Sequence, residues 1–147
     1  MAGVATISFC GVLLLILIIL KKVRARFGEV DEKFGKPYFS KIVKIIGGHP
    51  DLKRGSMAIS LHPKDAIAFN RKVFLFSQIS SIKIISQLPI KLNNGRKTAV
   101  AEVDEQYLCI EVKDEHGEHE VVFTTKSDFI EVANKLIQKW NKYNLLN

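Results

Sequence analysis

The chain begins with an uncharged stretch, residues 2–20, that contains no Pro, Asn or Gln. As a helix rising about 1.5 Å per residue, it would reach about 28 Å, close to the roughly 30 Å hydrocarbon thickness of a bilayer. Four cations and no acid follow within residues 21–26. We therefore predict one membrane-spanning helix, with residues 1–27 forming the anchor and its basic end.

Three other interpretations of this stretch fit less well. A cleaved signal peptide ends in a small-residue cleavage site after a basic start, whereas this run ends in Ile18, Ile19 and Leu20. A lipoprotein leader would place a small residue before Cys10, where the chain has Phe9. A buried core helix would be too long and too apolar for a small domain.

The cations that follow the stretch set the expected orientation. Lys and Arg are enriched on cytoplasmic flanks, so we expect the N-terminus outside and residues 21–147 in the cytoplasm, at the cell membrane. Cys10 and Cys109 could not meet in this arrangement, which predicts free thiols in a reducing compartment.

Small side chains in the first half of the stretch predict a contact with another membrane helix, because they let two backbones approach closely. Four of them share one helix face: Ala2, Gly3, Thr6 and Cys10. The expected partner is another membrane protein or a second copy of the chain. A second small-residue face lies roughly opposite and leaves the choice of face open: Ala5, Ser8 and Gly11.

The charge of the remaining chain is uneven. Residues 21–97 carry 17 basic and 5 acidic side chains, a net +12, whereas residues 98–147 carry 5 basic and 10 acidic, a net −5. A basic half behind an anchor is typical of a surface that contacts anionic lipid, at ~1 kcal/mol per cation, although solvated lysines give the same pattern. The cations are too scattered to indicate nucleic-acid binding. The candidate lipid contacts are Lys21, Lys22, Arg24, Arg26, Lys44, Lys53 and Arg54.

The rest of the chain has room for one domain, which we place at residues 41–147 behind a linker at residues 28–40. Its apolar pattern first has the period of strands and ends with the period of a helix, so the predicted fold class is α+β, mostly β. The predicted strands are residues 42–46, 57–61, 66–69, 73–76, 79–85, 107–113 and 119–124. The apolar face of the predicted C-terminal amphipathic helix comprises Phe129, Val132, Ala133, Leu136, Ile137, Trp140 and Tyr143.

About seven short antiparallel strands followed by one helix resemble the pleckstrin-homology superfold over residues 41–144. The segment Gly47-Gly48-His49-Pro50-Asp51-Leu52, the strand Gly55-Ser56-Met57-Ala58-Ile59-Ser60-Leu61 and the spacing of Phe76, Ile79 and Ile82 resemble bacterial members of this group, which are PH-like or GRAM-like. The resemblance implies a bent sheet or partial barrel whose open end is closed by the C-terminal helix, with Trp140 facing the barrel.

Many eukaryotic members of that group bind phosphoinositides through a Lys followed, after a gap, by two cations separated by one residue. Lys44 matches the first position, but Lys53 and Arg54 are adjacent and Gly55 follows them. This departure means that the resemblance implies no particular lipid head group.

No pattern in the sequence predicts catalysis, a cofactor or a metal site. There is no Walker-type phosphate loop and no nucleophile elbow. His116 and His119, with Asp114 and Glu115 beside them, straddle a predicted hairpin turn, which favours an exposed polar turn over a metal site. His49 precedes a Pro in a loop and has no clustered partner in the sequence.

We therefore predict a non-catalytic single-pass membrane protein whose cytoplasmic PH-like domain binds another protein, as an accessory subunit of a membrane complex. The alternative is an anionic-lipid-binding module at the inner membrane surface. A third interpretation places the domain outside the cytoplasm in a secretion or conjugation machine, where a helix usually precedes the sheet, whereas here it follows.

Overall fold

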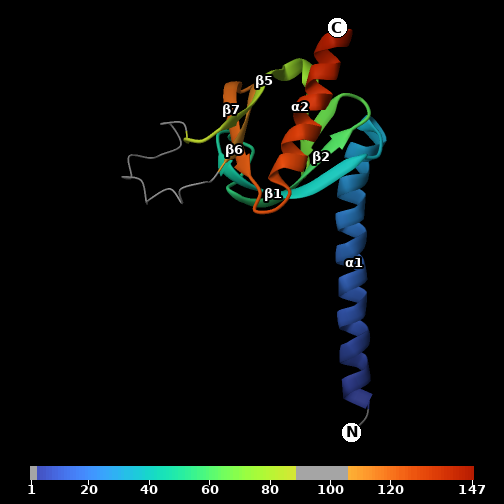
Figure 1. The fold of residues 1–147 in the computed structure, drawn as a ribbon. Coiled ribbons are helices and arrows are strands. Elements are labelled where there is room, and N and C mark those ends of the chain that lie inside the picture. The colour runs from blue at the N-terminus through green and yellow to red at the C-terminus, as the bar shows by residue number, and fades with distance from the viewer. Residues whose placement is uncertain (1–2, 89–105) are drawn as a thin grey trace.

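The computed structural model describes residues 3–88 and 106–147, and the side chains from Gly11 onward except those of residues 23, 26 and 27. A long helix leads into a seven-stranded antiparallel sheet, and a second helix lies across the sheet (Figure 1). The helices are α1 (Gly3–Phe34) and α2 (Phe129–Leu146), with a short 3-10 helix η1 (Phe76–Gln78). The strands are β1 (Phe39–Gly47), β2 (Gly55–His62), β3 (Ala66–Phe69), β4 (Lys72–Leu75), β5 (Ile79–Ile85), β6 (Tyr107–Asp114) and β7 (Gly117–Thr124).

The membrane-spanning helix predicted from residues 2–20 is wrong. In the part of the chain that the structure describes, no helix combines the length and the apolar character needed to cross a membrane. The predicted single-pass topology, outward N-terminus and cell-membrane localisation with a cytoplasmic domain are corrected with it.

Helix α1 also continues through most of the predicted linker. It passes Gly28 without a break and ends at Phe34. Gly35 then adopts a left-handed φ of 83°, and its N–H donates to the carbonyl of Asp31 at 2.8 Å. Glycine adopts this left-handed conformation without steric cost and therefore ends the helix here. Pro37 disfavours any further helix.

The strands follow the order β4-β3-β2-β1-β7-β6-β5, so β4 and β5 are the edges of the sheet. Each half is a run of sequential antiparallel neighbours, β1 to β4 and β5 to β7, and the pairing of β1 with β7 joins the halves. The strands and α2 lie where apolar periodicity predicts them, because half-buried strands and one-sided helices both leave that pattern.

The main core lies between the sheet and α2. Phe69 is central to it, with ring centres 6.1 Å from Phe74 and 5.3 Å from Phe123. Helix α2 contributes three buried side chains, Val132, Ala133 and Leu136. Trp140 is half-buried against this cluster, and its Nε1 has no hydrogen-bond partner among the described residues.

We predict that Leu136→Ala lowers the free energy of unfolding by ~2–5 kcal/mol, because it removes a fully buried side chain and leaves a cavity. Urea unfolding followed by tryptophan fluorescence measures this change. Leu145→Ala is the matched control on the same helix, since Leu145 is 86% exposed, and should change stability by less than ~0.5 kcal/mol. Equal losses from both variants would contradict the assigned packing of α2.

Gly48 occupies a position that no other residue fits. Its φ is 112°, and a Cβ there would lie 1.7 Å from the carbonyl oxygen of Glu120 on β7. The pairing of β1 with β7 also shifts register between Ile45 and Gly47, directly before this contact. The absence of a side chain at Gly48 therefore allows the two halves of the sheet to meet.

We predict that Gly48→Ala lowers the free energy of unfolding by more than ~2 kcal/mol, because the new Cβ both clashes and strains the backbone. Gly28→Ala is the control: a Cβ there meets nothing within 4 Å, and Ala is favoured inside a helix by ~1 kcal/mol. Thermal unfolding of both variants tests this, and an unchanged melting temperature for Gly48→Ala would refute the close approach.

Candidate functional site

A buried polar cluster forms where the β1–β2 connection meets the β6–β7 turn. His49 lies in that connection, and its Nε2 is 2.8 Å from Oδ2 of Asp114 at the end of β6. The backbone N–H of Asp51 donates to Nδ1 of His49 at 3.1 Å. Because Nδ1 is an acceptor, the hydrogen-bond network assigns the ring proton to Nε2, which donates it to the Asp114 carboxylate.

Asp114 is the acceptor at the centre of this cluster, and its side chain is only 4% exposed. Besides His49, Oδ2 receives the ammonium group of Lys72 at 3.2 Å, and Oδ1 receives the backbone N–H of His116 at 2.9 Å. Burial alone would raise the pKa of Asp114, but the three donors outweigh it and hold the pKa well below its usual range. Lys72 also pairs with Asp51 at 2.8 Å.

A metal could in principle use three side chains of the cluster, since His49, Asp114 and His119 each offer one ligand atom and these atoms lie within 4.8 Å of one another. The polar contacts of His49 and Asp114 argue against a bound metal. A metal on Nε2 of a neutral His49 would require the proton on Nδ1, where the Asp51 N–H already points. Lys72 also places its own cation against the same oxygen of Asp114. We interpret the cluster as a structural link between strands.

The sequence prediction that His49 has no clustered partner is wrong. Its ring centre lies 4.9 Å from that of His119 and 5.8 Å from that of His116. The two histidines of the hairpin turn were recognised from the sequence, but His49 is 65 residues from Asp114. No local signal connects positions so far apart, so only the β1–β7 pairing brings them together.

We predict that the cluster makes the free energy of unfolding depend on pH in the acidic range. The pKa of Asp114 is lower in the folded than in the unfolded chain, where it is about 3.9, so its contribution is complete above ~pH 5 and is lost as pH falls below ~4. Asp114→Asn should destabilise the protein most near pH 6–7, and its difference from the wild type should shrink by about half or more by pH 2.5.

Urea unfolding at a series of pH values measures this difference. Glu118→Gln is the control, since Glu118 pairs with Lys113 and both side chains are exposed. The plot of stability against pH for this variant should run parallel to that of the wild type. A pH-independent gap between the wild type and Asp114→Asn would show that Asp114 acts through packing rather than through its charge.

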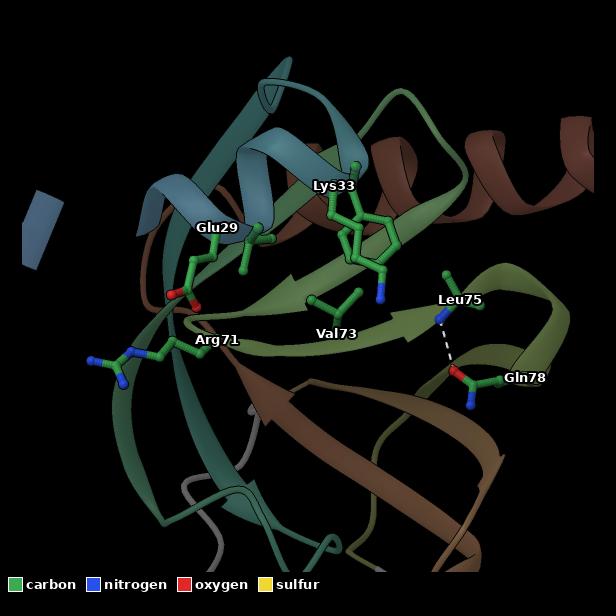
Figure 2. Close-up of a pocket in the computed structure, with 8 residues that line it drawn as sticks. Glu29, Lys33, Arg71, Val73, Leu75 and Gln78 are labelled. Atoms are coloured by element: carbon green, nitrogen blue, oxygen red, sulfur yellow. Dashed lines mark hydrogen bonds between the residues drawn. The ribbon is translucent and has the colours of Figure 1, made fainter. Parts of the chain in front are cut away.

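A cleft of about 400 Å³ lies between the C-terminal end of α1 and the edge strand β4 (Figure 2). Its walls are the apolar side chains of both elements, and its rim carries charge. In Figure 2, Glu29 and Arg71 lie at one end, and the ammonium group of Lys33 points from α1 toward β4. The lining residues are Glu29, Val30, Lys33, Phe34, Arg71, Val73, Leu75 and Gln78.

His62 fixes the α1 wall of this cleft. It is 1% exposed at the end of β2, and its Nδ1–H donates to the carbonyl of Gly35 at 2.7 Å. The other ring nitrogen, Nε2, accepts from the hydroxyl of Ser60 at 3.1 Å. Lys64 adds two bonds, from its N–H to the carbonyl of Phe34 at 3.3 Å and from Nζ to the carbonyl of Lys33 at 3.0 Å.

The predicted lipid contacts do not form one surface. Lys21, Lys22 and Arg24 are exposed on the part of α1 that projects away from the sheet, whereas Lys44 is exposed on β1 (Figure 1). Lys53 and Arg54 are exposed in the β1–β2 connection. The side chain of Arg26 lies outside the described residues, and lipid binding stays a prediction.

Other candidate residues fall outside the described part of the chain or outside both sites. The side chains of the predicted helix–helix contact are not described: Ala2, Gly3, Thr6 and Cys10. Cys109 is almost fully buried on β6, where burial raises the pKa of its thiol to about 11. That thiol is therefore unreactive at neutral pH.

Comparison with protein-family models, with curated proteins and with solved structures gives no match. The resemblance to the pleckstrin-homology superfold therefore stays a prediction from the sequence, and the function has to be argued from the surfaces of this chain.

Proposed function

We propose that this chain is a non-catalytic accessory subunit that binds another protein, and that α1 is its principal contact. The observation that supports this most directly is the exposure of a continuous aliphatic run on α1. All nine residues from Val12 to Leu20 are Val, Leu or Ile, and each is between 48% and 63% exposed.

Nine consecutive positions cover every side of a helix, because one turn takes 3.6 residues. The run therefore has no polar face that could stay in water while an apolar face packs on the sheet. A helix that is apolar all round is normally buried in the interior of a larger assembly. Exposed apolar patches of this kind mark interaction sites. The expected occupant is a set of apolar helices from a partner protein, packed around α1.

We propose no catalysis because of the contacts of two polar groups of residues, the His49–Asp114 cluster and the Ser60–His62 pair. Within the described residues, Asp114 is bonded both to His49 and to Lys72, so these polar atoms are already engaged. Ser60 and His62 have the contact that a nucleophile and its base require. His62 is buried, however, and neither residue lines the cleft.

The proposal predicts that polar substitutions on α1 release the chain from its complex. In the cells that naturally produce it, the tagged full-length chain should migrate well above its own 16.6 kDa on native size separation. The pair Leu14→Ser and Ile18→Ser, on one side of α1, should reduce the complexed fraction about tenfold, which corresponds to about 1.4 kcal/mol. The melting temperature of this double variant should equal that of the wild type, because the two side chains do not belong to the core of the sheet.

Glu32→Gln is the matched control on the same helix, since Glu32 is exposed but lies outside the aliphatic run. It should leave the complex intact. A wild-type chain that migrates as a monomer, a complex built from copies of this chain alone, or a double variant that still assembles would each overturn the accessory-subunit role.

A further inference from the structure

We propose that the cleft between α1 and β4 binds a short, extended, acidic peptide segment of a partner, which pairs with β4 as an additional strand. The site is separate from the aliphatic run of α1 and uses different chemistry. It goes beyond the proposed function by assigning a second surface and the kind of segment that this surface accepts.

The backbone of β4 has an unpaired side along the edge of the sheet. Among the described strands, β4 lies at an edge of the sheet and has β3 as its single neighbour. Phe74 pairs with Ile67, and the N–H of Phe76 donates to the carbonyl of Asp65 at 2.9 Å, both on the β3 side. Because backbone groups alternate between the two sides of a strand, those of Val73 and Leu75 point the other way.

The hydrogen bonds of Leu75 confirm this alternation. Its N–H donates to the side-chain oxygen of Gln78 at 2.9 Å instead of to β3 (Figure 2). Val73 has no such substitute: across residues 3–88 and 106–147, no hydrogen bond satisfies its outward N–H or carbonyl. An incoming strand would supply the missing donor and acceptor, as in other cases of strand addition to a sheet edge.

The side chains of the cleft specify what kind of strand fits. Val30 and Phe34 form an apolar wall opposite Val73 and Leu75. An extended peptide presents alternate side chains to the same face, so a strand added beside β4 can direct an apolar residue and the residues two positions before and after it to the face that carries the cleft. β4 is four residues long, about 13 Å, which sets the length of peptide that can pair with it.

The charge at the rim of the cleft favours acidic residues in the bound peptide. Lys33 and Arg71 form no ion pair within the described residues, and Lys33 directs its ammonium group toward β4 (Figure 2). Glu29 is the single carboxylate of the lining, so the cleft carries one net positive charge. A peptide carboxylate near Lys33 would gain a charge-assisted hydrogen bond, whereas a cation there would be repelled.

The test uses the full-length chain and two fluorescein-labelled probes in fluorescence anisotropy. The acidic probe is acetyl-Glu-Thr-Val-Thr-Glu-Thr-amide, in which Val and both Glu share one face of the strand, and the basic probe replaces both Glu by Lys. The acidic probe should bind at least about tenfold more tightly than the basic one. The reversal Lys33→Glu with Arg71→Glu should invert this preference, a result that simple unfolding cannot produce.

A second variant tests the backbone pairing alone. Val73→Pro removes the outward N–H, and proline is tolerated where an edge strand faces away from its neighbour. It should weaken the acidic probe about tenfold with an unchanged melting temperature. Lys53→Glu is the control: it reverses one charge at an exposed site in the β1–β2 connection and should leave binding unchanged.

Equal binding of the two probes, no binding of either, or acidic-probe binding that survives both the charge reversal and Val73→Pro would overturn the proposal. The Leu14→Ser and Ile18→Ser pair should still bind the acidic probe. Loss of the α1 contact and loss of the peptide site are therefore distinguishable, since each has its own variant and its own readout.

Discussion

The pairing of β1 with β7 is the contact on which the sheet depends. Among the described strands, it is this pairing that joins the half made of β1 to β4 with the half made of β5 to β7. Directly after β1, Gly48 lies against the Glu120 carbonyl, and His49 then donates to the buried carboxylate of Asp114. A close backbone approach and a buried hydrogen bond thus reinforce the same junction. Without it, the core that Phe69 and Phe123 share across the two halves would open.

The half made of β1 to β4 positions α1. His62, at the end of β2, bonds to Gly35 directly after the helix, and Lys64, in the turn before β3, bonds to the carbonyl of Lys33 in its last turn. The buried His62 has one nitrogen donating and one accepting, so the neutral ring satisfies both without a charge in the core. With its end held in this way, α1 presents Val30 and Phe34 to β4, while its aliphatic run projects away from the sheet (Figure 1).

Two surfaces are left uncovered by the residues that the structure describes. One is apolar on every side of α1, and the other is a strand edge with unpaired backbone groups beside two cations. The polar groups of the buried cluster, in contrast, are engaged with one another, as Asp114 is with His49 and Lys72. This division supports the proposed role in binding another protein.

Local periodicity was enough to place the strands and α2. The alternation of Met57, Ile59 and Leu61 marks β2, and three- and four-residue steps through Leu136 mark α2, because burial of one face leaves its period in the sequence. Hydropathy alone was not enough for residues 2–20, since a bilayer and the interior of an assembly both favour apolar side chains. The linker predicted from residue 28 begins later than expected, because α1 passes Gly28 and ends at Phe34, and a single glycine inside a helix costs only about 1 kcal/mol. Only the tertiary structure decided that β4 is an edge, that His49 meets Asp114 and that Val73 faces a cleft. Each of these depends on which strands become neighbours, and strand order is set by contacts between distant residues that no local pattern records.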